Sequence, residues 1–376
     1  MRPRTKDYVR VTRRVEEGLE RPAATPHRVI ERFLAASWDL LGATGSCWHL
    51  TDPLSGLPVS SSAAGEPAGT LERSLEFEYV RPDVSCFADL RARRSPVASI
   101  SSETGGAMRS SARYREMIQP SGAADELRIA FRDVFGMWAS LVVFTNRAMT
   151  PQDLQFASGA ALAATAPLRA ATARVALVAT ESSVPARSTG TDDPARASVH
   201  DGPSVVILDG ADRVVAADAT SRARLKVLPE DRDVTVPGVV SCLAAQARAW
   251  THTGRATARM RTVDGRWFAL DASAMQDDPG SVAIVIQPAD LDDIREALLR
   301  ALGLSARERQ IALRSVHGQS AKEIARDLHI SPWTVQDHLK AIYAKTGVIR
   351  RSDLSAMVTG RPAPPTLPTS SCARRH

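Results

Sequence analysis

Three short stretches near the carboxyl end of this 376-residue chain decide how that end folds. They read LSARER at residues 304–309, AKEIA at residues 321–325 and ISPWTVQDHLK at residues 330–340. Each places apolar residues next to a polar residue that can start a helix, so we interpret them as three successive short helices.

The helix starts are marked by capping residues. Residues 305–308 (SARE) and 320–323 (SAKE) are capping boxes. In a capping box the serine oxygen accepts a hydrogen bond from a first-turn amide, and the glutamate accepts one from the serine amide. Ser331 is an N-cap followed by Pro332, which has no amide to leave unbonded at the first helical position.

The apolar residues then recur at helical spacing. They are Ile324, Ala325 and Leu328 on the second helix, and Val335, Leu339, Ile342 and Tyr343 on the third. Gly318 separates the first two helices, and His329 with Ile330 links the second to the third. Two short helices joined by so tight a turn predict a helix-turn-helix, whose second helix lies in the DNA major groove.

Residues 304–357 resemble the LuxR-type (GerE-type) DNA-binding domain of bacterial transcription regulators. The resemblance rests on the Leu-Ser-x-Arg-Glu opening, the Lys-Glu-Ile-Ala core and the Ile-Ser-x-x-Thr-Val-x-x-His stretch. Lys345, Gly347-Val348 and Arg351-Ser352 complete the pattern. It covers about one residue in seven of the chain and implies an all-α, four-helix domain.

The charge distribution favours a polyanionic partner for the same segment. The chain has a formal net charge of +6 and a pI near 9.4. Residues 303–358 hold nine cations and five anions, so +4 of that excess lies there. Three of the five lysines, Lys322, Lys340 and Lys345, are also in this segment.

Composition sets the remaining expectations. A chain of this length with 44% hydrophobic residues suggests two or three domains with real cores. The four cysteines, Cys47, Cys86, Cys242 and Cys372, show neither metal-ligand spacing nor a disulfide pattern. Because no run approaches eighteen apolar residues and no signal core opens the chain, we expect a soluble cytoplasmic protein without membrane contact.

Residues 25–181 resemble a GAF-type sensor domain. The expected elements are a helix from residue 26, strands at 46–50 and 75–80, a hairpin at 127–132 and 137–145, and an Ala-rich helix from 150 to about 179. The likeness is closest at residues 138–144, followed by Met149-Thr150-Pro151-Gln152-Asp153. Residues 1–24 are expected as a charged N-terminal arm, flexible or a short helix.

Residues 204–288 resemble a PAS domain. The expected order is strands at 205–208 and 214–217, a helix at 219–225, and strands at 256–263, 267–273 and 282–287, with an Asp264-Gly265 turn. We expect a linker at 182–203, a connecting helix at 289–302, the helix-turn-helix domain at 303–360 and a disordered tail at 361–376. The expected fold class is multidomain α+β: two antiparallel-sheet sensor domains followed by a four-helix LuxR-type domain.

The resemblance implies base-reading positions at Gln336, Asp337 and Lys340, on the face opposite the apolar residues. Gln can pair with adenine, Lys with guanine, and Asp can accept from cytosine. Asp337 departs from the family's usual neutral or basic residue and can instead repel phosphate. The candidate backbone contacts are Ser320, Lys322, Ser331, Thr334, His338, Lys345, Arg350 and Arg351. For each of these the alternative is a cap, a packed side chain or a solvated charge.

Other chemistry is not expected. Cys47-Trp48-His49 and residues 83–86 lack the second ligand pair that a metal site needs. Asp209 ends a strand as the phosphoacceptor of a receiver domain does, but a hairpin follows it and the required acidic pair and downstream lysine are missing. No catalytic constellation stands out, so we expect neither an enzyme nor a cofactor.

The expected function is that of a one-component transcription regulator whose sensor-like domains control binding to double-stranded DNA, with RNA polymerase as a further partner. The alternative is a scaffold whose GAF-like and PAS-like domains dock a protein, with DNA binding secondary. A small-molecule effector cannot be read from the sequence. We expect a homodimer paired through the last helix, with Leu354, Met357 and Val358, or otherwise through the sensor-like domains.

Overall fold

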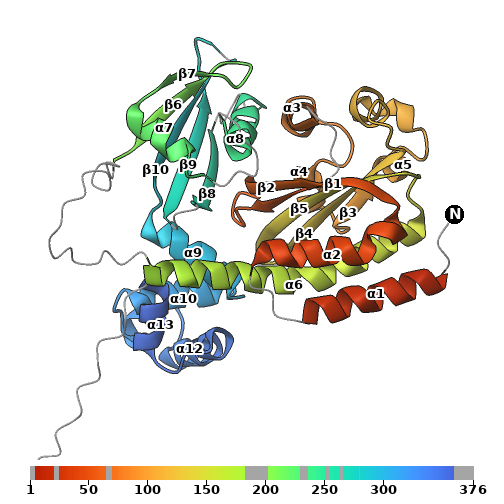
Figure 1. Ribbon diagram of the computed structural model, residues 1–376. Coiled ribbons are helices and arrows are strands. Elements are labelled where there is room, and N and C mark those ends of the chain that lie inside the picture. Colours follow the sequence, from red (N-terminus) through yellow and green to blue (C-terminus); the bar gives the residue numbers. More distant parts are fainter. Residues whose placement is uncertain are drawn as a thin grey trace, which may run out of the picture.

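The computed structural model describes residues 5–20, 25–64, 70–182, 202–228, 236–249, 255–262, 266–278 and 280–359. Nearly all of the expected linker 182–203, the tail 361–376 with Cys372, and the Asp264-Gly265 turn lie outside these ranges. Two sheet-containing blocks sit side by side above the long helix α6, and the last helices lie below it (Figure 1). None of the described helices is long and apolar enough to cross a membrane.

The first block is a five-stranded antiparallel sheet in the order β2-β1-β5-β4-β3. Its strands are β1 (Ala43–Thr51), β2 (Pro58–Ala64), β3 (Val97–Ser99), β4 (Asp125–Asp133) and β5 (Gly136–Thr145). Helices α2 (Pro26–Leu41) and α6 (Pro151–Ser182) cover one face (Figure 1). The shorter elements on the other side are α3 (Thr70–Leu75), a π-helix at Glu76–Val80, α4 (Phe87–Ala92), α5 (Ile100–Glu103), a 3-10 turn at Met108–Ser110 and a second π-helix at Tyr114–Ile118.

The expected hairpin is confirmed as β4 and β5, and the helix from residue 26 as α2, capped by Thr25. The strand expected at residues 75–80 is wrong. The segment is helical, with a π-helix at Glu76–Val80. Its alternating apolar and acidic side chains have different partners in the folded chain. Phe77 is fully buried, while Glu78 forms an ion pair with Arg128 on β4. Tertiary contacts therefore override the local strand preference.

The amino-terminal segment is not a separate arm. Residues 5–20 form helix α1 (Thr5–Glu20), which packs against α2 and α6. Tyr8, Val11 and Val15 are buried in the core of the first block, and the Tyr8 hydroxyl donates to Asp153 Oδ1 at 2.7 Å. The numerous charges of this segment lie on the opposite side of the helix and mask its narrow apolar stripe in the composition.

The second block repeats the same strand order, β7-β6-β10-β9-β8, in another antiparallel sheet. Its elements are β6 (Ser204–Leu208), β7 (Val214–Ala217), α7 (Ala219–Leu225), α8 (Gly238–Ala249), β8 (Arg255–Arg261), β9 (Trp267–Ala274) and β10 (Val282–Pro288). Helix α8 packs on this sheet and also contacts β2 and the π-helix of the first block. Leu57 of the first block lies in the core of the second, so the two blocks share apolar packing.

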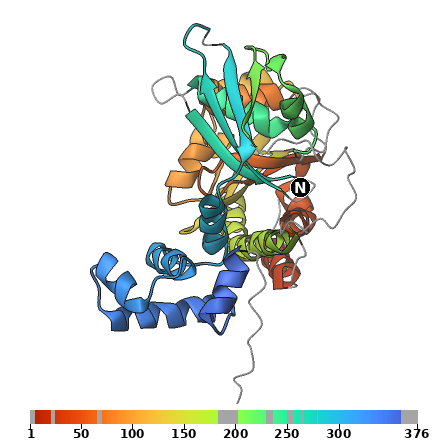
Figure 2. The same ribbon diagram turned by 90° about the vertical axis from the view of Figure 1, so that its left-hand side faces the viewer.

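The carboxyl-terminal helices are α9 (Leu291–Ala301), α10 (Ala306–Val316), α11 (Ala321–Asp327), α12 (Pro332–Thr346) and α13 (Arg351–Thr359). Figure 2 shows the last of these helices, coloured blue, projecting from one side below the sheets. Helix α9 takes part in two cores, because Ala301 is buried in the first block and Leu299 among the carboxyl-terminal helices. It therefore joins the two parts physically.

Candidate nucleic-acid interface

Both capping boxes form as expected. The Ser305 amide donates to Glu308 Oε2 at 2.6 Å and the Ser320 amide to Glu323 Oε2 at 2.7 Å, while each serine oxygen accepts the return bond. Ser331 Oγ accepts from the Thr334 amide at 3.0 Å. Three of the predicted phosphate contacts, Ser320, Ser331 and Thr334, therefore serve the helix starts.

Helix α12 has one buried and one exposed face. Val335 and Ile342 are fully buried, and Leu339 nearly so, in the core formed with α10 and α11. Gln336, Asp337 and Lys340 are exposed. The helix lies at the far end of the molecule from both sheets (Figure 1). The predicted base-reading side chains are therefore grouped on an open helix face.

An ion pair modifies the charge of this face. Lys340 Nζ lies 3.3 Å from Asp337 Oδ1, with side chains that are 73% and 53% exposed. A pair so open to water is weak, so either partner can leave it for a new contact. Asp337 therefore lowers the positive charge offered by Lys340 without locking it.

Trp333 is an exposed residue of this face that the sequence reasoning missed. It is 72% exposed, and Lys340 Nζ lies 5.5 Å from its ring centre. Positions 333, 336, 337 and 340 share one side of a helix. One sequence feature could have identified Trp333: it lies two residues after the N-cap Ser331, at a position outside the apolar periodicity of α12.

Lys345 is engaged within the protein. Its Nζ lies 2.7 and 2.8 Å from the two carboxylate oxygens of Glu308, which links α12 to α10. Burial alone would raise the pKa of the Glu308 carboxyl, but hydrogen bonds from Lys345 and Ser305 hold it below its usual value. Lys345 thus stabilises the helix packing, whatever it also does at a phosphate.

Of the remaining predicted phosphate contacts, one is bonded within the protein and the others are wholly or partly open to solvent. Arg351 donates from Nε and Nη2 to the Ser315 carbonyl oxygen at 3.0 and 2.5 Å, linking α13 to α10. Lys322 and Arg350 are exposed, and His338 is half-buried. Lys322 and Arg350 are therefore the cations of the predicted set that are best placed for an external partner.

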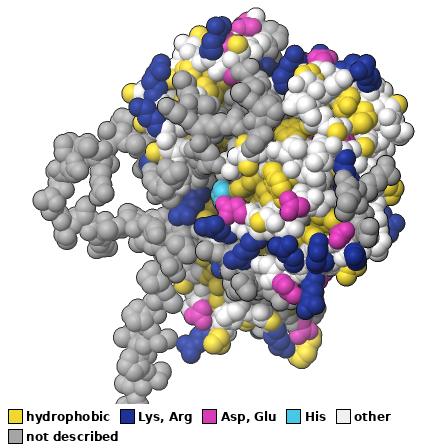
Figure 3. All heavy atoms as spheres, turned by 45° about the vertical axis from the view of Figure 1, so that its right-hand side comes forward, with side chains coloured by type: hydrophobic (Ala, Val, Ile, Leu, Met, Phe, Trp, Pro, Cys, Tyr) yellow, Lys and Arg dark blue, Asp and Glu magenta, His cyan; other side chains and the backbone are white. Residues whose placement is uncertain are grey.

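Charges elsewhere are mixed. On the face shown in Figure 3, Lys and Arg side chains lie among Asp and Glu side chains and do not form one basic patch.

Among the described residues, no group of His, Cys, Asp and Glu is arranged to hold a metal ion. Cys47, Cys86 and Cys242 are buried and not in disulfide bonds, and burial raises the pKa of Cys86 to about 11.

Asp209 lies in a surface turn after β6, where it accepts hydrogen bonds from the Ala211 and Arg213 amides and from the Arg213 side chain. These hydrogen bonds, chiefly the one from the Arg213 amide, lower the pKa of the Asp209 carboxyl. The surrounding sheet is antiparallel, whereas a receiver domain has a parallel one. The site serves the turn.

Residues 302–358 match the family described as "Bacterial regulatory proteins, luxR family". The chain is 33% identical over 101 residues to the putative HTH-type transcriptional regulator YhjB of Escherichia coli (strain K12), covering 27% of this chain and 47% of that protein. It is 44% identical over 62 residues to the transcriptional regulatory protein FixJ of Rhizobium meliloti (strain 1021), covering 16% and 30%. A 45% identity over 49 residues to the probable transcriptional regulatory protein NarL of Mycobacterium tuberculosis covers 13% and 23%. The chain thus spans less than half the length of each relative.

Solved structures resemble the chain only remotely. The crystal structure of the phage VqmA-DPO complex matches 44% of this chain and 87% of that chain at 20% identity, with a TM-score of 0.18. The bacteriophytochrome RpBphP3 of R. palustris matches 76% and 63% at 11% identity, with a TM-score of 0.32. The family match covers the carboxyl-terminal helices, which form a LuxR-type helix-turn-helix domain.

Proposed function

We propose, from the LuxR-type domain at residues 302–358, that the chain is a sequence-specific DNA-binding regulator of transcription whose amino-terminal blocks control its binding to DNA. The observation that carries the proposal is the open face of α12. Its polar side chains stand opposite a fully packed core, at the end of the molecule away from the sheets. A helix presented in this way can enter a major groove without unfolding anything.

We assign roles on this face by chemistry. Gln336 offers both a donor and an acceptor, which suits adenine, and Lys340 donates to guanine once it leaves Asp337. Asp337 either accepts from cytosine or disfavours sites that bring a phosphate close. Trp333 adds an apolar surface that can contact a thymine methyl group or a sugar.

The proposed contacts to the DNA backbone depend on which cations already have a partner within the protein. Lys322 and Arg350, which are exposed, bind phosphates, and Ser320, Ser331, Thr334 and His338 flank the same groove edge. Lys345 and Arg351 hold α12 and α13 onto α10 in the first instance, and any phosphate contact is secondary. These contacts position the domain without reading sequence.

Control by the amino-terminal blocks has a structural route. We infer that the first block is GAF-like and the second PAS-like, since both sheets are antiparallel and have helices packed on them. Arg169 on α6 donates to the Ala301 carbonyl at 3.2 Å, and Arg309 on α10 pairs with Glu296 on α9 at 2.7 Å. A change in α6 therefore reaches α10 through one helix.

The chain acts as a homodimer in this proposal, with RNA polymerase as a further partner. Of the three residues expected to pair there, Leu354 and Val358 are instead buried in the core of their own domain, and Met357 is half-buried. Helix α13 also contacts α6 and α9. We therefore place the main dimer contacts on the amino-terminal blocks, the alternative expected from the sequence.

Selection from a random duplex library with the purified full-length chain tests the proposal. We expect enrichment of one sequence with dyad symmetry, half-sites about one helical turn apart, and binding that falls steeply with salt. The double variant Gln336→Ala, Lys340→Ala should lose the enrichment and keep weak binding to random DNA. Absence of any enriched sequence at low salt would refute sequence-specific binding.

A further inference from the structure

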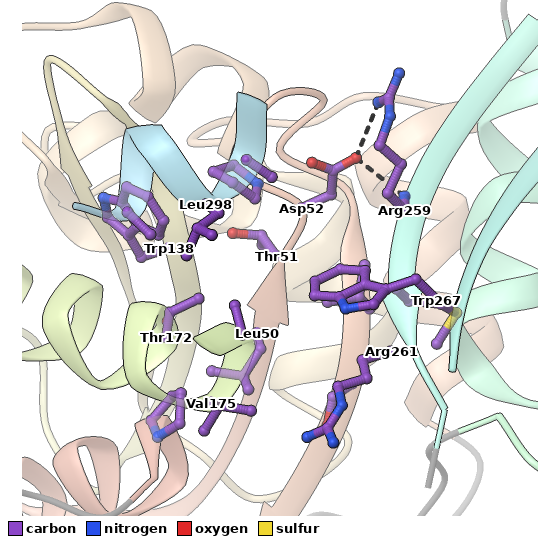
Figure 4. A pocket seen from close by; sticks show the side chains of 18 of the residues that line it. Leu50, Thr51, Asp52, Trp138, Thr172, Val175, Arg259, Arg261, Trp267 and Leu298 are labelled. Atoms are coloured by element: carbon purple, nitrogen blue, oxygen red, sulfur yellow. Dashed lines mark hydrogen bonds and ion pairs between the residues drawn. The ribbon is translucent and has the colours of Figure 1, made fainter. Parts of the chain in front are cut away.

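A cavity of about 340 Å³ lies where the two blocks meet α6 and α9. Leu50 and Thr51 on β1 and Trp138 on β5 come from the first block, and Trp267 on β9 from the second (Figure 4). Leu298 on α9 closes another side. The volume falls within the range of small-ligand pockets. Residues from four separate regions of the chain therefore enclose one space.

The cavity is lined mainly by apolar side chains. Leu50, Val175, Met260 and Leu298 supply aliphatic or thioether surface. Two aromatic residues also line it in Figure 4: Trp267 on one side and, on the other, Trp138, which is only 1% exposed. A space with the Trp267 indole on one side and mainly aliphatic groups elsewhere suits a flat, largely apolar molecule.

Two hydroxyl donors of the lining, on Thr51 and Thr172, are already used. The Thr51 hydroxyl donates to the Met137 carbonyl at 2.6 Å, and the Thr172 hydroxyl donates to the Leu168 carbonyl at 3.0 Å. Neither hydroxyl proton is left for a ligand.

The charged groups at the edge of the cavity also have partners. Asp52 is almost fully buried and accepts from the Leu54 amide at 2.9 Å and the Arg259 amide at 3.1 Å. The Arg259 guanidinium lies 3.5 Å from Asp52 and donates from Nε to Asp293 at 2.8 Å. The charges of Asp52 and Arg259 offset each other at the cavity edge, and Arg261 adds a further positive charge to the lining.

Trp267 is different. Its indole Nε1 is buried and has no hydrogen-bond partner among the described residues. Buried donors in folded proteins almost always have a partner, because leaving one unbonded is costly. Trp267 lines the cavity, but its Nε1 is itself closed off, so an acceptor held in that space reaches it once the indole ring turns.

We propose that this cavity binds a small aromatic molecule that accepts a hydrogen bond from Trp267 Nε1 and lies against the Trp267 ring. The proposal assigns the regulator its effector class and extends the proposed function, but the binding step itself does not depend on DNA.

The position of the cavity gives the ligand a route to the DNA-binding domain. Val175 on α6 and Leu298 on α9 both line it. The residue after Leu298, Leu299, is fully buried in the core of the helix-turn-helix domain. A molecule held between α6 and α9 therefore changes how α9 sits on α6, and with it the placement of α10 to α13.

Binding of the dye prodan to the full-length protein tests the site. Prodan is an uncharged naphthalene that carries a ketone acceptor, and its emission moves to shorter wavelength in apolar surroundings. Direct excitation of the dye avoids any dependence on tryptophan emission. We expect saturable binding of one dye per chain, with the dissociation constant raised roughly fivefold by Trp267→Phe, which keeps the ring and removes the donor.

Two further variants sharpen the test. Val175→Phe, on the cavity wall, should abolish saturable binding by filling space. Trp38→Phe is the matched control, because Trp38 packs against the first core and does not line the cavity. If Trp267→Phe fails to fold by circular dichroism, Val175→Phe with Trp38→Phe still decides the matter. No saturable binding by the wild type, or binding that both cavity variants leave unchanged, overturns the proposal.

A DNA-binding measurement with and without saturating prodan separates the two proposals. A changed affinity for the selected duplex supports coupling through α9. If the dye binds in the cavity but the chain binds no DNA, the proposed function fails and the ligand site stands. If DNA binds and prodan does not, the reverse holds.

Discussion

Replacing Asp153 by Asn should destabilise the first block by about 2 kcal/mol at neutral pH. The Asp153 side chain is fully buried and accepts from Tyr8, from both terminal nitrogens of Arg147, and from the Thr150 amide and hydroxyl, at 2.6 to 2.8 Å. Burial would raise its pKa, but the bonds from Arg147, Tyr8 and Thr150 outweigh burial and lower it from 3.8 to about 2. That difference corresponds to about 2 kcal/mol of preference for the charged form in the folded chain.

The sign of the pH dependence follows from the lowered pKa. The contribution is fully present above the unfolded-state pKa of 3.8 and is lost as the pH falls through about 2. Urea unfolding of wild type and Asp153→Asn should therefore differ most near neutral pH, and the difference should shrink as the pH is lowered from about 5 towards 3. Asp39→Asn, at an exposed position on α2, is the control and should change little. A difference that stays constant over this pH range would show that the ionised carboxylate is not the source.

Three further predictions concern the DNA-binding domain and are measured by fluorescence anisotropy on the selected duplex and on random DNA. Gln336→Ala should cost about 1–3 kcal/mol on the selected duplex and leave random DNA unaffected, and equal losses on both would contradict base reading. Trp333→Ala should cost on the order of 1 kcal/mol of DNA affinity without lowering the melting temperature, because the ring is 72% exposed; unchanged affinity would remove it from the interface. Lys345→Ala should lower the affinity for both duplexes alike. It should also lower the stability of the protein by about 1 kcal/mol, because Glu308 loses its ion-pair partner; the value is small because Lys345 is 42% exposed. An unchanged melting temperature would assign Lys345 to phosphate binding alone.

The helix-turn-helix domain could be predicted in detail because its signals are local. Each helix start is written within four residues, as in the capping box at 305–308, and each buried face recurs at helical spacing. The β4–β5 hairpin was predictable for the same reason, since its two strands and turn are contiguous. Where the deciding contacts lie within one turn of helix or one hairpin, the sequence is sufficient.

Helix α1 and the segment at residues 75–80 could not be predicted in this way. The partners of Tyr8 and Val15 are on α2 and α6, and Asp153 lies 145 positions away from Tyr8. Glu78 is held by Arg128, 50 positions along the chain. Such long-range contacts decide the local structure while leaving no pattern near the residues themselves. Lys345 belongs to the same class, because its partner Glu308 is 37 positions away.

The cavity is the extreme case of this limit, and it bears on how such a regulator can respond. Thr51, Thr172, Trp267 and Leu298 come from β1, α6, β9 and α9, so no window of sequence contains the site. Because the cavity is lined by both blocks and by α9, a ligand bound there would contact all of these parts at once. In the mechanism proposed above, a ligand held inside one sheet block would act on that block alone. A ligand held between both blocks and α9 would act on a helix whose residue Leu299 is buried in the helix-turn-helix domain. The proposed coupling would therefore require only a small displacement of one helix, because α9 is already part of both cores.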